Sequence, residues 1–442
     1  MADHAKSSDP AVQRQLDRLT LLSPGRDVLG LERIGALLDR LGNPQHELPP
    51  VFHVAGTNGK GSTCAYLRAA LEASGRRVHV YTSPHLVRFN ERIRVADALI
   101  ADDMLAPLLE EVLAVADDIQ PSFFEATTAA AFLAFRRVPA DACVIEVGLG
   151  GRLDATNVIE HPLVTGIAQL GLDHQAFLGD RIEDGAAEKA GIAKPGAPLV
   201  TMHYPASIAT RVGAIARDAR ARWIPKGSGW DAVVYQGRLH YRDEEGRLDL
   251  PVPRLVGAHQ AMNAALAIAM LRHQSRLAIS ESAMRAAVSW AEWPARLQML
   301  IDGPLRARLP AGSELWIDGG HNPSAGRAIA DFFRGHIAAG QPFHLILGML
   351  ENKDAAGFLK PFSGRTAVVH GVPVADHPHH DPENLATAAR MCGHSARAAS
   401  DPLAALDWIA RHADRDHPPV VLIGGSLYLA GMMLAENGTP PE

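Results

Sequence analysis

The sequence predicts an α/β protein with a mostly parallel, doubly wound main sheet and a second, smaller α/β domain. Two observations lead to this prediction. Short apolar runs bounded by Gly, Pro or Asp alternate with helical stretches, and successive parallel strands need such crossover helices. The alternation is interrupted near residue 295 and then starts again. The 442 residues are enough for about two or three domains with ample core.

The N-terminal part contains the strongest strand–turn–helix pattern. The segment Pro50–Ala55 is apolar enough for a buried strand, and a glycine-rich turn follows it. An amphipathic helix over 62–74 then places Leu67 and Leu71 on one face and ends before Gly75. Further strands are expected at 78–82, 142–147, 163–170 and 198–202, and helices at 105–117, 126–136 and 182–193.

The C-terminal part repeats the alternation on a smaller scale. Trp293–Arg296 follows helical segments around 259–290, so we expect an N-terminal domain of residues 1–295 and a C-terminal domain of residues 296–442. The second domain is expected to be a Rossmann-like α/β domain. Its strands are expected at 315–318, 343–348, 366–372 and 419–423, and its helices at 324–334 and 403–412.

Charge and cysteine content exclude several classes of protein. Lys+Arg 43 against Asp+Glu 49 leaves a formal net charge of −6, which argues against general nucleic-acid binding. Cys64, Cys143 and Cys392 are too far apart for a disulfide framework or a zinc site, and they suit a reducing compartment. The N-terminus lacks an apolar signal, and the apolar run Ala126–Phe135 is too short to span a bilayer. We therefore expect a cytoplasmic protein with no membrane or nucleic-acid partner.

A candidate phosphate-binding loop lies between the first strand and the helix that follows it. Glycines let backbone N–H groups approach a phosphate, a lysine reaches the outer phosphates, and a hydroxyl at the helix start can ligate Mg²⁺. The spacing departs from the usual P-loop, and a turn that merely joins strand to helix is the alternative. The residues are Gly56, Thr57, Asn58, Gly59, Lys60, Gly61 and Ser62. They predict a P-loop domain that binds ATP or GTP.

Three further residues are candidates by position. Glu146 closes an apolar run, where a carboxylate can hold nucleotide-bound Mg²⁺ or simply face water. His174 follows the strand at 163–170, on the edge where α/β ligands bind, although a lone histidine is commonly structural. Lys189 lies on an expected helix and by itself reads as a surface lysine. The histidine-rich segment 377–381 has no helical ligand spacing, so we expect a solvated loop there rather than a metal site.

Ten segments resemble the folylpolyglutamate synthase and dihydrofolate synthase branch of the Mur ligases, in family order and over nearly the whole chain. They are GTNGKGS (56–62), TSPHLVRFNERI (82–93), FFEATTAAAF (123–132), IEVGLGGRLDATN (145–157), LGLDHQAFLG (170–179), EKAGI (188–192), WPARLQ (293–298), DGGHNP (318–323), GMLENKD (348–354) and GGSLYLAG (424–431). Gly320 and Asn352 stand where the family often has Ala and Asp, and neither change removes a group assigned to chemistry.

The resemblance implies an ATP-dependent amide ligation. ATP phosphorylates a carboxylate to an acyl phosphate, and the amino group of L-glutamate then attacks and releases phosphate. Ser62 and Glu146 match ligands of the ATP-bound Mg²⁺, and His174 matches a ligand of a second metal. Lys60 would neutralise phosphate charge. Lys189 matches a lysine that the family carbamylates with CO₂, which turns a cation into an anion able to organise the second metal.

The resemblance also assigns residues on the nucleotide's other sides. Asn263 matches an adenine-side contact, and Arg296 matches an arginine that approaches the phosphates from the hinge. Asp318 and His321 match residues of the C-terminal domain that close over the nucleotide. ATP is therefore expected between the domains, where closure would complete the site.

Two substrate subsites follow from the same resemblance. The pterin pocket would involve Ser83, Pro84, Phe124 and Asp154. An aromatic ring suits a flat heterocycle, and a carboxylate accepts hydrogen bonds from an amino-pyrimidine ring. Core packing explains Phe124 about equally well. For the incoming glutamate, the matching residues are Ser426 and Tyr428.

These roles favour a bifunctional enzyme that joins L-glutamate to dihydropteroate, giving dihydrofolate, and then extends reduced folates with further glutamates. A folylpolyglutamate synthase without the first activity is the alternative, and a Mur enzyme acting on a nucleotide-sugar peptide is more remote. A P-loop nucleotide switch without ligase activity would explain residues 56–62 but leave Arg296 and 318–321 without a purpose. The expected partners are small molecules only, and the family implies a monomer.

Overall fold

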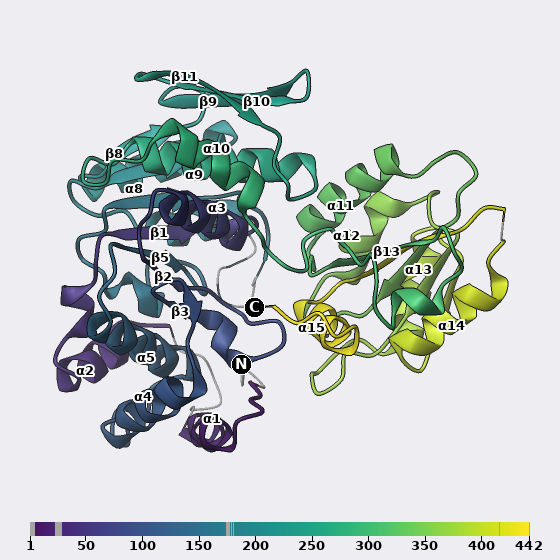
Figure 1. Cartoon of the computed structure of the whole chain (residues 1–442), viewed down its shortest axis with the longest axis horizontal. Helices are drawn as coiled ribbons and strands as arrows, with labels where there is room; N and C mark the ends of the chain where they lie inside the picture. The colour runs from purple at the N-terminus through teal and green to yellow at the C-terminus, as the bar shows by residue number, and fades with distance from the viewer. Residues whose placement is uncertain are drawn as a thin grey trace. The chain divides into compact units, whose positions relative to one another are not determined.

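The computed structural model describes residues 5–22, 29–173, 177, 179, 181–414 and 416–441. The chain divides into two compact units, which Figure 1 colours from purple to teal and from green to yellow. The first unit comprises residues 1–254 and 259–292, and the second comprises residues 255–258 and 293–442.

An eight-stranded sheet forms the centre of the first unit, in the order β4-β3-β2-β5-β1-β6-β7-β8. The six strands from β2 to β8 in this order are parallel, whereas β3 and β4 add an antiparallel edge. The bounds are β1 Val51–Ala55, β2 Val78–Tyr81, β3 Ile93–Val95, β4 Ala98–Leu99, β5 Ala142–Glu146, β6 Val164–Ile167, β7 Pro198–Thr201 and β8 Arg222–Pro225. Residues of β1, β2, β5 and β6 are buried throughout, as expected for parallel strands covered on both faces.

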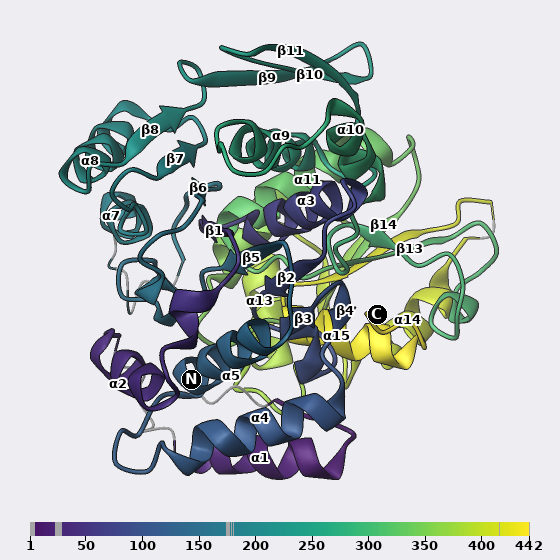
Figure 2. The same cartoon turned by 60° about the vertical axis from the view of Figure 1, so that its left-hand side comes forward.

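Helices cover this sheet. They are α1 Pro10–Leu22, α2 Glu32–Arg40, α3 Lys60–Ala73, α4 Asp102–Ala114, α5 Phe123–Arg137, α7 Ile182–Ala190, α8 Ala206–Asp218, α9 Ala258–Arg272 and α10 Glu281–Trp290, with short 3₁₀ turns η1 Pro44–Glu47, η2 Phe89–Arg92 and η3 Ala155–Val158. Figure 2 shows α1, α4 and α5 side by side, and their buried side chains form one apolar core together with α2. α10 packs along α3, the helix that follows the phosphate loop.

A three-stranded antiparallel sheet, which the sequence analysis does not predict, completes the first unit. It contains β9 Trp230–Tyr235, β10 Arg238–Asp243 and β11 Gly246–Pro251. The two residues between β9 and β10, Gln236 and Gly237, both have positive φ, which matches the twist of a two-residue hairpin. The sheet appears at the top of the unit in Figure 1.

The second unit is built on a six-stranded sheet in the order β12-β13-β17-β14-β15-β16. Only the pairing of β12 with β13 is antiparallel. The strands are β12 Gln298–Met299, β13 Glu314–Asp318, β14 Phe343–Leu347, β15 Val368–Gly371, β16 Ala396–Ala398 and β17 Val420–Gly424. The helices are α11 Pro323–His336, α12 Ala355–Leu359, α13 Pro382–Met391, α14 Pro402–His412 and α15 Leu427–Glu436, with 3₁₀ turns η4 Arg306–Arg308 and η5 Lys360–Phe362.

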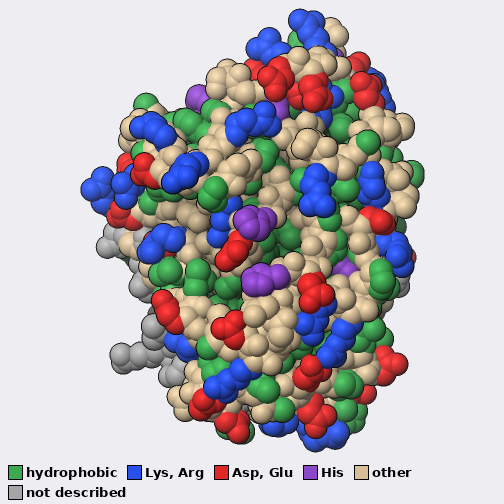
Figure 3. Space-filling model, turned by 90° about the vertical axis from the view of Figure 1, so that its left-hand side faces the viewer, with side chains coloured by type: hydrophobic (Ala, Val, Ile, Leu, Met, Phe, Trp, Pro, Cys, Tyr) green, Lys and Arg blue, Asp and Glu red, His purple; other side chains and the backbone are tan. Residues whose placement is uncertain are grey.

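The predicted fold class is confirmed: a large parallel sheet in the N-terminal part and a second α/β unit in the C-terminal part. Among the described residues, every helix is too short or too polar to cross a membrane. On the face in Figure 3, positive and negative side chains are interspersed, and the coloured residues there form no continuous basic stripe.

Candidate active site

The predicted phosphate loop connects β1 to α3 at the carboxyl edge of the large sheet. The backbone N–H groups of Thr57 and Asn58 donate to the carbonyl of Gln169, at 2.8 and 3.2 Å, and this holds the loop against the segment after β6. Because α3 begins at Lys60, its first N–H groups have no carbonyl partner within the helix. They are suited to an anion.

Gly59 is required at its position for two reasons. Its φ of 86° lies in the left-handed region, and a Cβ there would collide with the side-chain amide of Asn263. Asn263 is buried on α9 and donates from Nδ2 to Gln260 Oε1 at 3.1 Å. The structure thus brings Asn263, predicted at the adenine side, against the phosphate loop.

Oxygen and nitrogen groups meet beside this loop. Glu146 ends β5, the neighbour of β1, and its Oε1 lies 3.8 Å from Lys60 Nζ. Its Oε2 accepts from the backbone N–H of Ser83 at 3.4 Å, and the peptide bond between Ser83 and Pro84 is cis. Ser62 is buried in the first turn of α3.

The donor set fits Mg²⁺, because the Ser62 hydroxyl and the Glu146 carboxylate are hard oxygen ligands. Within the described ranges, no three His, Cys, Asp or Glu side chains cluster as a self-sufficient metal site. His174, the predicted ligand of a second metal, lies outside the described residues.

Lys189 is not a surface lysine. It lies in the last turn of α7 and is only 5% exposed. Burial, with a smaller contribution from the positive charge of Lys60, lowers the pKa of Lys189 to about 8, while Asp173 and Glu188 oppose that shift. About a tenth of the amine is therefore neutral at pH 7.

On the substrate side, Asp154 is the N-cap of η3 and is 2% exposed. Its Oδ1 accepts from the backbone N–H and the hydroxyl of Thr156, and its Oδ2 accepts from the N–H of Leu149. Burial raises the pKa of Asp154, and these hydrogen bonds and the charge of Lys60 counteract the rise.

Phe124 is half-buried at the start of α5. Its ring stacks on Tyr81 with centroids 5.9 Å apart. It also lies so close to Gly148 that a Cβ at residue 148 would collide with the ring. The Phe124 ring therefore packs between Tyr81 and the backbone of Gly148.

In the second unit, an unusual turn presents Arg296. Its neighbours Ala295 and Leu297 both have positive φ, 56° and 43°, which is uncommon for residues with side chains. Two acceptors stabilise the turn: Gln298 Oε1 binds the N–H of Ala295 at 2.9 Å, and Asp318 Oδ2 binds the N–H of Leu297 at 2.8 Å.

The other predicted residues of the second unit lie at strand and helix ends. The Nδ1–H of His321 donates to the carbonyl of Gly319 at 3.0 Å, which places the lone pair of a neutral ring on Nε2. Ser426 caps α15 by accepting from the N–H of Tyr428 at 3.1 Å. Residues 377–381 form a loop in which Pro378 and Asp381 are exposed, and its half-buried His377 ring stacks on Tyr428 with centroids 3.8 Å apart.

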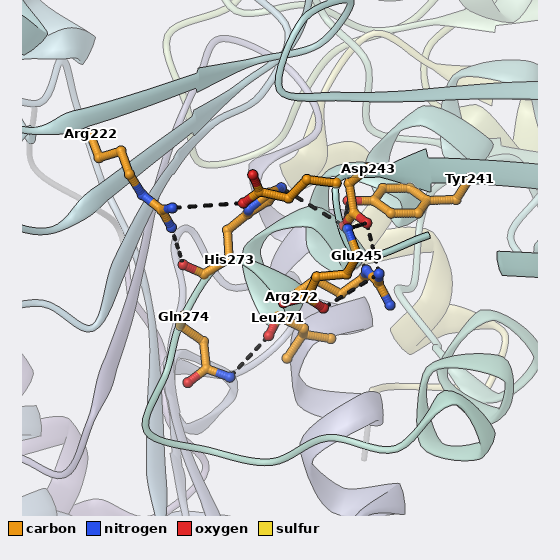
Figure 4. A network of polar contacts seen from close by, with 9 residues as sticks. Arg222, Tyr241, Asp243, Glu245, Leu271, Arg272, His273 and Gln274 are labelled. Atoms are coloured by element: carbon orange, nitrogen blue, oxygen red, sulfur yellow. Dashed lines mark hydrogen bonds and ion pairs between the residues drawn. The ribbon is translucent and has the colours of Figure 1, made fainter. Parts of the chain in front are cut away.

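Another polar region occupies the opposite, amino edge of the large sheet. A cavity of about 570 Å³ lies there between the starts of β6, β7 and β8, the end of α9 and the β10–β11 turn. Figure 4 shows its polar network, in which Arg272 binds Asp243 through two hydrogen bonds of 2.6 and 2.7 Å. Arg222 donates to the carbonyl of His273 at 2.9 Å. Sequence reasoning gave no indication of this region, because its residues come from separate elements.

Comparisons with known proteins agree with the resemblance. Residues 306–427 match the Mur ligase, glutamate ligase domain. The folylpolyglutamate synthase of Lacticaseibacillus casei is 36% identical over 424 residues, covering 90% of this chain and 92% of the relative. The dihydrofolate synthase/folylpolyglutamate synthase of Escherichia coli (strain K12) is 34% identical over 407 residues, covering 90% and 89%.

Solved structures agree over almost the full length. The structure of E. coli FolC in complex with DHPP and ADP has a TM-score of 0.86 and 30% identity, covering 97% of both chains. A bifunctional folylpolyglutamate synthase/dihydrofolate synthase with Mn, AMPPNP and L-glutamate bound has a TM-score of 0.83 and 33% identity, covering 97% of this chain and 99% of that chain.

Proposed function

Because the chain belongs to the folylpolyglutamate synthase/dihydrofolate synthase family of the Mur ligases, we propose that it is a bifunctional ATP-dependent ligase. It joins L-glutamate to dihydropteroate, giving dihydrofolate, and to the γ-glutamyl end of reduced folates. The observation that carries this proposal is the grouping of Lys60, Glu146, Asp154 and Lys189 around one glycine-rich loop. Complexes of similar proteins with DHPP and with L-glutamate support the choice of substrates.

The reaction depends on binding the phosphates and stabilising their charge, and it requires no side-chain nucleophile. The substrate carboxylate attacks the γ-phosphorus of ATP, ADP leaves, and an acyl phosphate forms. The amino group of L-glutamate then attacks the acyl carbon, the C–O bond to phosphate breaks, and the ammonium proton is lost to a base or solvent. Lys60 and the amino end of α3 stabilise the negative charge of the transferred phosphoryl group. Ser62 and Glu146 would hold Mg²⁺, which supplies Lewis-acid neutralisation of the phosphates.

Lys189 is proposed to react with CO₂. Its neutral amine forms an N–C bond to CO₂ and loses one proton, which leaves an anionic carbamate. The burial of Lys189 and its pKa of about 8 support this step, since only the neutral amine is nucleophilic. The carbamate and His174 would organise a second metal. Intact-mass measurement and ¹³C NMR with labelled bicarbonate test this, and a protein that incorporates no label would contradict it.

Residues of the second unit are proposed to act on the nucleotide and on glutamate. Arg296, Asp318 and His321 are assigned to the ATP side together with Asn263, and Ser426 and Tyr428 to the incoming glutamate. The turn around Arg296 has positive φ at Ala295 and Leu297. This supports the assignment of Arg296, because strained backbone concentrates at functional positions. We also propose a monomeric, cytoplasmic enzyme, which suits the three free cysteines.

Phosphate release tests the proposal directly. Purified protein is given Mg-ATP and L-glutamate with either dihydropteroate or tetrahydrofolate, and the products are weighed. We expect release with both acceptors and products heavier by one glutamate. Release with tetrahydrofolate alone would favour a monofunctional folylpolyglutamate synthase, the name carried by the L. casei relative. ATP hydrolysis that needs neither acceptor nor glutamate would indicate a nucleotide switch instead.

A further inference from the structure

We propose that His53, acting through Thr156, is a positioning residue that holds the Asp154 carboxylate ionised and leaves one oxygen, Oδ2, to receive a donor group of the pteridine. This inference rests on the proposed function, which assigns Asp154 to the pteridine. His53 lies in the middle of β1, is fully buried, and has no part in the phosphate chemistry.

Three side chains form a continuous buried chain of hydrogen bonds. The His53 Nε2 atom lies 2.8 Å from the Thr156 hydroxyl oxygen. That hydroxyl lies 2.5 Å from Asp154 Oδ1. A threonine hydroxyl has one proton, so a hydroxyl that donates to Asp154 must accept from an N–H on His53.

The unbonded nitrogen of His53 decides the direction of this chain. Its Nδ1 is buried and has no hydrogen-bond partner among the described residues. In the opposite arrangement the Thr156 hydroxyl would donate to His53. Nε2 would then be the acceptor, and Nδ1 would carry a buried N–H without a hydrogen-bond partner. Orphaned N–H groups are rarer than under-satisfied acceptors, so the Nε2–H form is favoured.

The ring of His53 stays neutral in this arrangement. Burial, reinforced by the nearby charge of Lys194, lowers the pKa of His53 to about 3. The Lys194 Nζ is itself held by the carbonyl of Asn157 at 2.9 Å, next to Thr156. His53 is therefore a fixed neutral donor across the range in which an enzyme works.

The same contacts limit what Asp154 can offer to a ligand. Oδ1 already accepts from the backbone N–H and from the hydroxyl of Thr156, which occupies both of its lone pairs. Among the described residues, Oδ2 accepts only from the Leu149 N–H, at 2.8 Å, so one lone pair remains. Asp154 therefore accepts a single N–H of the pteridine through Oδ2, rather than forming a bidentate pair with two N–H groups.

Two matched pairs of variants test the chain. Thr156→Val removes the hydroxyl and keeps the shape, whereas Thr156→Ser keeps the hydroxyl. His53→Met removes the donor, whereas His53→Gln supplies another one. We expect Thr156→Val to raise the dihydropteroate KM about tenfold, since a hydrogen bond to the charged Asp154 is lost. His53→Met should raise it less, about threefold, because it removes only the donor that orients the Thr156 hydroxyl. Both variants should leave the ATP KM unchanged.

A pH profile separates positioning from packing. Without the Thr156 donor, the Asp154 pKa rises, so the acid limb of kcat/KM for dihydropteroate should move to higher pH. Thr156→Ser and His53→Gln should keep both the dihydropteroate KM and the acid limb of the pH profile close to those of wild type. A folded Thr156→Val protein with unchanged KM and an unchanged limb would overturn the relay.

Two further measurements keep the outcomes distinct. Equilibrium binding of dihydropteroate to the full chain repeats the comparison without turnover; wild-type protein that binds neither dihydropteroate nor tetrahydrofolate would contradict the proposed function instead. If the variants do not fold, ¹⁵N NMR of wild-type His53 decides. The Nε2–H tautomer is expected, and the Nδ1–H tautomer or a doubly protonated ring would overturn the proposal.

Discussion

The two edges of the large sheet differ in how their charges are balanced. At the amino edge, the 9%-exposed Arg272 side chain binds the fully buried Asp243 carboxylate in a bidentate pair. At the carboxyl edge, Lys60 and Lys189 are close enough for one charge to lower the pKa of the other. The close bidentate pair at the amino edge stabilises the fold, whereas Lys60 at the carboxyl edge has only a 3.8 Å contact with Glu146, and two like charges beside a loop of N–H groups favour a bound anion.

The largest effect on catalysis is expected from removing a charge at the carboxyl edge. Lys60→Met should lower kcat for ligation about 10³-fold, because a preorganised cation facing the transferred phosphoryl group is lost. The folded structure should persist, since Lys60 makes only a 3.8 Å contact with Glu146. Initial rates of phosphate release measure the effect. Arg222→Gln, at the amino edge, is the control and should leave kcat within about twofold.

Removing a charge at the amino edge should act on stability instead. Asp243→Asn leaves Arg272 buried without its partner and should lower the free energy of unfolding by about 3 kcal/mol. Urea unfolding measures this. Glu245→Gln is the matched control, because Glu245 is 59% exposed and its ion pair should contribute less than about 1 kcal/mol. A loss of kcat in folded Asp243→Asn protein would contradict the division between the edges.

The buried amine of Lys189 gives a pH test of the carboxyl edge. Its pKa is about 8 in the folded protein, below the ordinary lysine value of 10.5, so the unfolded chain binds more protons between these pH values. The free energy of unfolding of wild type, relative to Lys189→Met, should therefore rise by about 2 kcal/mol as pH increases from 8 to 10.5. Urea titrations at several pH values measure it. Parallel curves for the two proteins would show that Lys189 is not held in a desolvated site.

A smaller effect is expected beside the substrate ring. Gly148→Ala adds a Cβ that collides with Phe124 and should raise the dihydropteroate KM about tenfold, with the ATP KM unchanged. Gly35→Ala on α2 is the control, because no atom lies within 4 Å of the added Cβ. It should change neither KM. Equal KM values for Gly148→Ala and wild type would mean that the Phe124 ring does not set substrate affinity.

Features with a local sequence pattern were predicted correctly, whereas features that depend on long-range contacts were not. The strands and the loop at 56–62 have signals within a few residues, and the structure forms β1 and α3 around them. The β9–β11 sheet was missed because its hairpin turn, Gln236-Gly237, is a weaker signal than Asn-Gly.

The site was predicted through resemblance where local sequence was silent. Lys189 has the sequence surroundings of an exposed helical lysine, and only tertiary packing buries it. His53 looks like one residue of a buried strand, and its contact with Thr156 spans over a hundred residues of sequence. Such contacts leave no trace in spacing or composition, so His377 on Tyr428 and Gln298 under Ala295 also escaped prediction.

The position of Asn263 beside Gly59 has a consequence for synthesis on the ribosome. The phosphate loop emerges early, yet α9 supplies its neighbour Asn263, and α10 at 281–290 covers the helix that follows the loop. The side of α3 that packs on α10 stays uncovered in the nascent chain until the late helices have left the exit tunnel, whereas its other side can already pack on β1, β2 and β5. Nucleotide affinity should therefore be acquired late in translation, after the third antiparallel strand has already been made.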